Sequence, residues 1–334
     1  MARVGVIGAG AFGTGMACVV RRAGHDTVIW AREPEVADAI NRDAANPVFL
    51  PGVRLVPGIA ATGDLAAAVE GADFLLLAPP AQHMRSVTAQ LAPVLKPGTP
   101  VVSCSKGVER GSCALMSQVI GATLPASPVA VLSGPSFANE IAVDLPTGVT
   151  LACADLALGK RLSHAIGTLR FRTYLTDDVI GTHLGGVLKN VLAIACGIAL
   201  GKKFGNSARS ALVARGLAET ARLGLAMGAR LETFMGLSGV GDMNLSCNSP
   251  SSRNMSLGIA LGEGRRLRDV LGERVTVQEG VHSAEGVAAL ASRHHVEMPI
   301  TAAVDRILNH GAGVDETIER LLSHPYGFER VAAA

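Results

Sequence analysis

The chain has 334 residues, a formal net charge of +2, 49% hydrophobic residues and only 17% charged residues. This length and apolar content allow two domains with large cores, and they exclude an intrinsically disordered chain. A net charge so close to zero, without a long basic cluster, argues against a nucleic-acid partner. We therefore expect a compact globular protein whose positive charge acts locally, on one small anion.

Cysteine, histidine and hydropathy patterns narrow the class further. The six cysteines show no C-x-x-C spacing, so free and mostly buried thiols are expected, and the nine histidines form no H-x-x-x-H pair, so no metal is predicted. No secretory signal precedes the first strand, and the best apolar run, residues 191–200, is too short to cross a bilayer. These features predict a cytoplasmic protein without stable membrane insertion.

A glycine-rich turn lies near the start of the chain, between a strand and a helix. Residues 4–7 form an apolar β-type run, residues 8–13 read G-A-G-A-F-G, and residues 11–23 are small and apolar. Residues 27–30 then read as a second strand, which completes a βαβ unit. A G-x-G-x-x-G pattern in this context is typical of dinucleotide-binding proteins, whereas an ordinary glycine-rich turn is the alternative.

Each position of this turn has its own physical role. Gly8 permits the sharp turn, Gly10 lets a pyrophosphate approach the backbone, and Gly13 lets the next helix pack closely on the sheet. The anion would lie on the N–H groups of the helix that starts near Ala11. The turn thus predicts a dinucleotide site.

The first half of the chain predicts a doubly wound sheet. Near-continuous apolar strands alternating with helices, such as residues 82–95, are typical of a parallel sheet covered on both faces. The further strand candidates are residues 72–78, 100–104, 129–132, 148–153 and 170–175. We expect an α/β fold in which residues 1–177 form a Rossmann-type, mainly parallel dinucleotide-binding domain.

The second half predicts an all-α domain. The strand signal ends after a plausible helix cap at residues 176–178, and apolar residues then recur at helical spacing. The predicted helices are residues 179–200, 207–227, 254–261, 283–293 and 298–309. We expect residues 178–330 to form a helical substrate-binding domain.

Arg32 bears on the choice of cofactor. The second strand of such a unit usually ends in an acidic residue that binds the ribose 2′-hydroxyl, but here Arg32 stands in that region. A cation there favours the 2′-phosphate of NADP, although the adjacent Glu33 can still accept the ribose of NAD. A solvated surface arginine is the alternative interpretation.

Two lysines are candidates for catalysis. Lys189 lies in the apolar segment 185–195, where burial would favour a side chain that gives and takes a proton near neutrality. A lysine that extends to solvent from the edge of the core is the alternative. Asn190 beside it can orient a substrate hydroxyl or be an ordinary amide. Lys106 follows a predicted strand, where active-site groups of such sheets are displayed, or it belongs to an ordinary turn.

Three further loops have residues suited to a bound ligand. The small residues of segment 132–140 follow a strand and permit close approach of a ligand to the backbone. Asp242 ends the glycine-rich loop 236–242, as a catalytic acid or as a carboxylate that binds backbone amides. Ser251 or Ser252 can cap a helix whose first turn, with the guanidinium of Arg253, would bind a phosphoester. An exposed charge is the alternative for Arg253.

Taken together, these segments resemble NAD(P)-dependent glycerol-3-phosphate dehydrogenases of the bacterial type. Several ordered blocks between residue 5 and about residue 285 are more specific than the glycine motif alone. The matching blocks are residues 8–14, 46–52 with Phe49-Leu50-Pro51-Gly52, 105–109, 132–140, 188–191, 236–242 with Cys247, and 252–254. Met255 stands where the family often has a basic residue, which leaves cofactor preference and affinity open.

The resemblance implies reversible reduction of dihydroxyacetone phosphate to sn-glycerol 3-phosphate for glycerophospholipid synthesis, with NADP preferred over NAD. It implies that Lys189 donates and accepts the proton, with Lys106 and Asp242 as its catalytic partners. Implied substrate contacts are Lys106, Gly134, Ser136, Lys189, Asp242, Ser252, Arg253 and Asn254. Implied cofactor contacts are Gly8, Gly10, Ala11, Phe12, Gly13, Arg32, Lys106, Ala138, Arg253, Val277 and Glu279.

Two other functions remain open from the sequence. A two-domain hydroxyacid or ketopantoate-type reductase would use a similar lysine but would favour a carboxylate over a phosphate. A non-catalytic NADPH-binding protein would be expected to lack Lys189 or Asp242, and both are present. The glycine- and alanine-rich helices also make a homodimer the expected assembly.

Overall fold

The computed structural model describes residues 1–273 and 279–323. The chain divides into two compact units. The first comprises Met1–Ser105 and Met116–Val179, and the second comprises Lys106–Leu115 and the chain from Ile180 onward. The segment Lys106–Leu115 therefore leaves the first unit, packs with the second, and returns.

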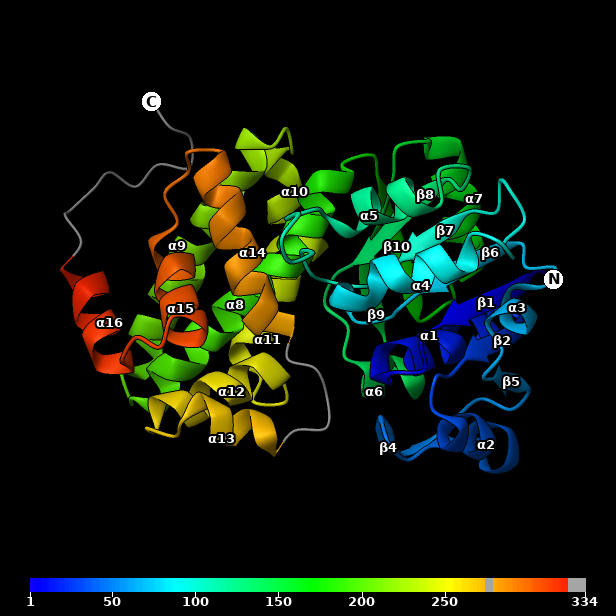
Figure 1. The fold of residues 1–334 in the computed structure, drawn as a ribbon, viewed down its shortest axis with the longest axis horizontal. Helices are drawn as coiled ribbons and strands as arrows, with labels where there is room; N and C mark the ends of the chain where they lie inside the picture. Colours follow the sequence, from blue (N-terminus) through cyan, green and yellow to red (C-terminus); the bar gives the residue numbers. More distant parts are fainter. Residues whose placement is uncertain (274–278, 324–334) are drawn as a thin grey trace. The chain divides into compact units, whose positions relative to one another are not determined.

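An eight-stranded sheet forms the centre of the first unit, in the order β10-β9-β8-β7-β6-β1-β2-β5 (Figure 1). Neighbouring strands are parallel except β8 and β9, so the predicted Rossmann-type, mainly parallel sheet is confirmed. The strands are β1 (Arg3–Ile7), β2 (Asp26–Trp30), β5 (Ile59–Thr62), β6 (Phe74–Leu77), β7 (Val101–Ser103), β8 (Val129–Ser133), β9 (Thr147–Cys153) and β10 (Phe171–Thr176).

Helices cover both faces of this sheet. Alternate strand residues such as Val4 and Val6 pack with α1, α6 and α7, whereas Gly5 faces α3, where a Cβ would lie 2.7 Å from the carbonyl oxygen of Ala68. Helices α4 and α5 pack together in front of the sheet in Figure 1. The bounds are α1 (Ala11–Arg22), α3 (Leu65–Val69), α4 (Met84–Leu91), α5 (Met116–Thr123), α6 (Ala138–Ala142) and α7 (Leu156–Ile166).

Three elements between β2 and β5 were not predicted. Helix α2 (Pro34–Asp43) begins with a proline at its first position, where the missing N–H costs nothing. Strands β3 (Ala45–Asn46) and β4 (Leu50–Arg54) then pair antiparallel, with an irregularity in register between Ala45 and Asn46. This short hairpin lies beside the glycine-rich turn, as described below.

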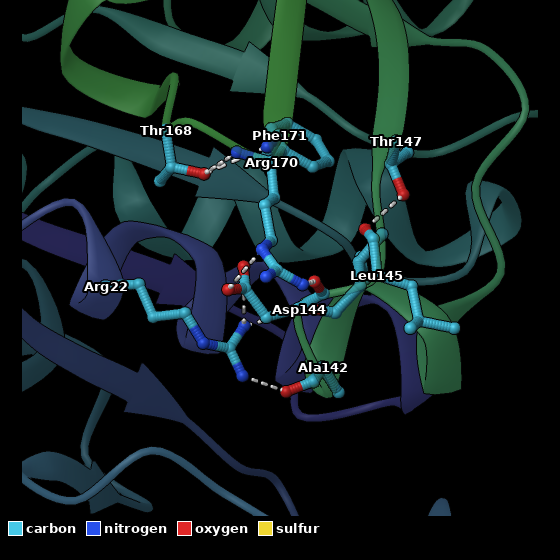
Figure 2. A network of polar contacts seen from close by, with 9 residues as sticks. Arg22, Ala142, Asp144, Leu145, Thr147, Thr168, Arg170 and Phe171 are labelled. Atoms are coloured by element: carbon cyan, nitrogen blue, oxygen red, sulfur yellow. Dashed lines mark hydrogen bonds and ion pairs between the residues drawn. The ribbon is translucent and has the colours of Figure 1, made fainter.

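Two arginines hold the turn between α6 and β9 (Figure 2). Asp144 adopts a positive φ of 65°. Its Oδ1 lies 4.0 Å from Nη1 of Arg22, and its Oδ2 lies 3.8 Å from Nε of Arg170. Such long, partly exposed ion pairs contribute little energy, but Arg22 also donates to the carbonyl oxygens of Ile141 and Ala142 at the end of α6. Helix α6 is thereby fixed against α1, the helix from which Arg22 extends.

The second unit is helical, as predicted: within the described residues its only β pairing is an isolated bridge between Val108 and Leu115. Helix α8 is buried along nearly its whole length and packs against the other helices. The helices are α8 (Val179–Gly201), α9 (Gly205–Ala226), α10 (Leu231–Met235), the π-helical turn η2 (Leu237–Gly241), α11 (Asp242–Asn248), α12 (Arg253–Gly262), α13 (Leu267–Gly272), α14 (Glu279–Arg293), α15 (Pro299–Asn309) and α16 (Val314–Leu322).

Glycines bring α12 into backbone contact with α8. A Cβ at Gly197 would lie 2.2 Å from the carbonyl oxygen of Met255, and a Cβ at Gly258 would lie 2.1 Å from that of Ile194. No larger residue fits at these positions without moving a backbone. The close approach sets the first turn of α12 against the middle of α8.

Helix α8 covers the predicted helix 179–200, and it is longer than the apolar run 191–200 that was judged too short to cross a bilayer. Among the described residues it is the one helix that is long and apolar enough to span a membrane, but 83% of its most apolar window is buried inside the protein. Core helices of soluble proteins have the same character. All six cysteines are free and buried, as predicted.

A buried histidine on α8 makes folding stability depend on pH. His183 is 2% exposed, and burial lowers the pKa of its imidazole from 6.5 to about 4. Since the folded-state pKa is the lower one, the neutral ring contributes its full stability above pH 6.5 and loses it as the pH falls toward 4.

We predict that the wild-type protein loses about 2 kcal/mol more unfolding free energy between pH 8 and pH 5 than His183→Gln does. Denaturant unfolding of both proteins at the two pH values measures this difference, and any constant packing cost of the substitution cancels. Equal pH dependence in the two proteins would contradict the prediction.

Candidate functional site

The glycine-rich turn has the geometry that its sequence predicted. Gly8 has a φ of +108°, and a Cβ there would lie 3.0 Å from the backbone of Ala78. A Cβ at Gly13 would lie 1.9 Å from the carbonyl oxygen of Gly8, so helix and turn are in direct contact. A Cβ at Gly10, in contrast, would meet no heavy atom within 4 Å outside its immediate chain neighbours. This open space at the start of α1 suits a pyrophosphate.

Arg32 follows β2 at the carboxyl edge of the sheet and is 72% exposed. Its Nε and Nη2 atoms donate to Oε1 of Glu33 over 3.0 and 2.7 Å. The cation and the acid considered for the cofactor ribose therefore pair with each other. A 2′-phosphate would compete with Glu33 for the guanidinium, whereas a 2′-hydroxyl would compete with Arg32 for the carboxylate.

Gly134, Ser136 and Ala138 follow β8, which is parallel to β7 and so ends at the same edge as β1 and β2. Gly134 has a φ of +138°, and the Ser136 hydroxyl donates to its carbonyl oxygen over 3.0 Å. Ala138 begins α6, and its carbonyl oxygen lies 3.0 Å from where a Cβ of Gly15 would be. The structure thus places Ala138 next to α1, the helix of the glycine-rich turn.

In the second unit, a buried carboxylate joins the two candidate lysines. Asp242 is completely buried, with Oδ2 lying 2.6 Å from Nζ of Lys106 and Oδ1 lying 3.0 Å from Nζ of Lys189. The lysine side chains are 13% and 14% exposed, which excludes the interpretation that Lys189 extends into solvent. Two ammoniums around one carboxylate leave one positive charge in excess, which suits an anionic ligand.

Close packing between η2 and α8 positions Asp242. A Cβ at Gly185 of α8 would lie 2.2 Å from the carbonyl oxygen of Ser238, and a Cβ at Gly239 would lie 2.1 Å from that of Phe234. The segment expected from the sequence to be a glycine-rich loop forms a π-helical turn. Asp242 directly follows that turn, as the first residue of α11.

Ser246 was not predicted as part of the site. It is 1% exposed and accepts a hydrogen bond from Nζ of Lys189 over 3.0 Å. The ammonium directs this hydrogen bond to Ser246 while it lies at ion-pair distance from Asp242. Because Ser246 is four residues after Asp242 on α11, their shared helix face was a signal available in the sequence.

A chain of amides connects four segments of the second unit. The N–H of Gly280 donates to Asn254 Oδ1 over 3.2 Å, and Asn254 Nδ2 donates to Asn190 Oδ1 over 2.9 Å. Asn190 Nδ2 then donates to the carbonyl oxygen of Lys106 over 3.3 Å. The backbone of Lys106 is therefore bound to the same helix that carries Lys189.

The segment Lys106–Leu115 is anchored to α14 as well. Arg293 donates to the carbonyl oxygen of Ser112 over 2.8 Å, and Arg110 forms an ion pair of 2.9 Å with Glu285. Val108 is completely buried, packed against the second unit's core. Lys106 thus belongs to the helical unit, although it follows a strand of the sheet in sequence.

The residues predicted to bind a phosphate lie at the start of α12. Ser252, and not Ser251, caps the helix by accepting from the N–H of Met255 over 3.4 Å. Arg253 has exposed surface, yet partial burial lowers the pKa of its guanidinium, while Glu279 raises it.

Val277, a predicted cofactor contact, lies outside the described residues. Within those residues, no group of three or more His, Cys, Asp or Glu side chains is placed to hold a metal ion.

The strand order and the glycine-rich turn define a Rossmann-type protein with an appended helical unit, the architecture of many dinucleotide-dependent oxidoreductases. Comparison with known protein families identifies the family to which this chain belongs. The model described as NAD-dependent glycerol-3-phosphate dehydrogenase N-terminus matches residues 3–158, and that described as the C-terminus matches residues 178–319. The chain belongs to the NAD-dependent glycerol-3-phosphate dehydrogenase family.

Individual relatives of the chain have the same family name. The protein named glycerol-3-phosphate dehydrogenase (NAD(P)+) of Parvibaculum lavamentivorans is 57% identical over 327 residues, 98% of either chain. That of Rhodospirillum rubrum is 55% identical and covers 98% of this chain and 93% of its own. A crystal structure of glycerol-3-phosphate dehydrogenase from Coxiella burnetii has a TM-score of 0.92 at 36% identity and covers 97% of this chain and 99% of that one. The two alternative functions are not favoured.

Proposed function

We propose that this chain is an NAD(P)-dependent oxidoreductase acting on a CH–OH group, which interconverts dihydroxyacetone phosphate and sn-glycerol 3-phosphate for glycerophospholipid synthesis. The observation that supports it most directly is the buried cluster of Lys106, Asp242 and Lys189. In this proposal residues 1–177 bind the dinucleotide, and residues 178–330, together with Lys106, bind the substrate.

Lys189 is the proposed proton donor and acceptor. As the substrate carbonyl becomes an alkoxide, negative charge grows on its oxygen, and a nearby ammonium can stabilise and then protonate it. Asp242 and Ser246 hold the Lys189 ammonium at a fixed position, and Lys106 supplies the second positive charge. Because all four side chains are largely buried, the interaction with the alkoxide is weakly screened by water.

The phosphate of the substrate is assigned to Ser252, Arg253 and Asn254 at the start of α12. Backbone N–H groups of a first helical turn and a guanidinium favour a phosphoester over a neutral group. Gly134 and Ser136 of the sheet unit are the remaining proposed substrate contacts. A fixed phosphate would hold C2 in one orientation for reduction, which is how positioning lowers the barrier.

For the cofactor, the residues present fit a nicotinamide dinucleotide, which when bound supplies or accepts the hydride. The open space beside Gly10 and the start of α1 would hold the pyrophosphate, with Gly8, Ala11, Phe12 and Gly13 around it. The remaining proposed contacts are Arg32, Lys106, Ala138, Arg253, Val277 and Glu279. Arg32 supports NADP as the preferred form over NAD.

The proposal also covers the cellular compartment and the oligomeric state of the enzyme. We infer a cytoplasmic enzyme, because its substrates are small, charged and water-soluble. Its glycine- and alanine-rich helices support a homodimer, in which small residues permit close packing between copies.

Lys189→Ala should lower kcat for dihydroxyacetone phosphate reduction by roughly 10²–10⁴-fold and change the KM for that substrate much less, because proton donation matters most in the transition state. Steady-state absorbance assays at the nicotinamide band measure both constants. Lys160→Ala, which removes an exposed ammonium on α7, is the control. Normal turnover of Lys189→Ala would refute its role, and faster reduction of ketopantoate than of the triose by the wild type would refute the substrate.

Arg32→Ala should lower the ratio of kcat/KM with NADPH to that with NADH by about 10-fold or more, since only the 2′-phosphate gains a charge-assisted hydrogen bond from the guanidinium. The matched control is Arg42→Ala, because exposed Arg42 pairs with the adjacent Asp43 as Arg32 pairs with Glu33. A ratio unchanged by Arg32→Ala would show that another group sets the preference.

A further inference from the structure

Asn46 connects the β3–β4 hairpin to the glycine-rich turn. Its side chain is completely buried, and Nδ2 donates to the carbonyl oxygen of Ala9 over 2.8 Å and to Oγ1 of Thr14 over 2.9 Å. Its Oδ1 accepts from the N–H of Phe49 over 3.0 Å. The side chain thus bridges the middle of the turn and the first turns of α1.

The orientation of this amide follows from its partners. The backbone N–H of Phe49 can only donate, so Oδ1 must face it, and the carbonyl of Ala9 can only accept, so Nδ2 must face that. Thr14 Oγ1 accepts from Asn46 and itself donates to the Ala9 carbonyl over 3.2 Å. Two buried donors therefore hold one carbonyl oxygen, which uses both of its lone pairs.

The direction of the Ala9 carbonyl determines that of the next N–H. In a planar trans peptide the C=O of one residue and the N–H of the next point in opposite directions. Since the Ala9 carbonyl is held toward Asn46 and Thr14, the N–H of Gly10 points away from these two side chains. A Cβ at Gly10 would meet no heavy atom within 4 Å outside its immediate chain neighbours, so this residue borders open space.

We propose that Asn46 is a positioning residue for dinucleotide binding: by fixing the Ala9–Gly10 peptide, it directs the Gly10 N–H toward the pyrophosphate. This inference rests on the proposed cofactor site at the turn. Asn46 acts through the peptide and does not touch the dinucleotide. It gives a function to the 46–52 block, which otherwise has no assigned role.

The test replaces the donor without changing its size. Asn46→Asp keeps an acceptor for Phe49 but places an oxygen against the Ala9 carbonyl, so we expect the Kd for NADPH, measured by isothermal titration calorimetry, to rise about 10-fold or more. The KM for NADPH should rise in parallel, while kcat at saturating NADPH and the KM for dihydroxyacetone phosphate change by less than about 3-fold. The control is Asn41→Asp, whose exposed side chain bonds Ala61 of β5 and not the turn.

A second pair of variants keeps the test decisive if Asn46→Asp fails to fold. Thr14→Val removes the hydroxyl that supports the same carbonyl and should also weaken NADPH binding, whereas Thr14→Ser keeps the hydroxyl and should restore it. Wild-type affinity in Asn46→Asp, or in Thr14→Val, would overturn the inference. Failure of the wild-type protein to bind NADPH or NADH would instead overturn the proposed cofactor site.

Discussion

The pairing of one buried carboxylate with two ammoniums is the constraint on which the helical unit depends. A completely buried Asp242 would cost several kcal/mol if unpaired, so it persists only where cations reach both of its oxygens. Those cations come from α8 and from the Lys106–Leu115 segment, while Asp242 belongs to α11. Three pieces of chain distant in sequence must therefore be in register, and the same register leaves one positive charge in excess.

The rest of the unit meets this requirement through close backbone contacts and directed hydrogen bonds. Glycine contacts set η2 and α12 against α8, which leaves little freedom for the residues that follow them. The amides of Asn190 and Asn254 bind the backbone of Lys106 to two of these helices. Arg293 fixes the other end of the Lys106 segment. The cluster of Lys106, Asp242 and Lys189 is therefore held by contacts within one unit.

Much of this architecture was predictable from the sequence because it depends on residues that are close together in the chain. Apolar runs predicted α8 and every strand of the eight-stranded sheet except β5, and the spacing of three glycines predicted the turn whose geometry the structure confirms. The β3–β4 hairpin was not predicted, because its short strands have no clear alternation and are held by the long-range bonds of Asn46. Nor did the sequence reveal that Lys106 joins the helical unit or that Ser246 binds Lys189, since both depend on tertiary contacts. The roles assigned to the site residues stay predictions.

The most direct measurement of the central claim is single-turnover reduction of dihydroxyacetone phosphate by Asp242→Asn, with NADPH affinity measured on the same sample. An amide keeps the size of the side chain but cannot compensate two ammoniums, so the rate should fall by about 100-fold or more while the Kd for NADPH stays within about 2-fold of wild type. A rate close to that of the wild-type protein would show that the buried carboxylate does not organise Lys106 and Lys189 for the reaction.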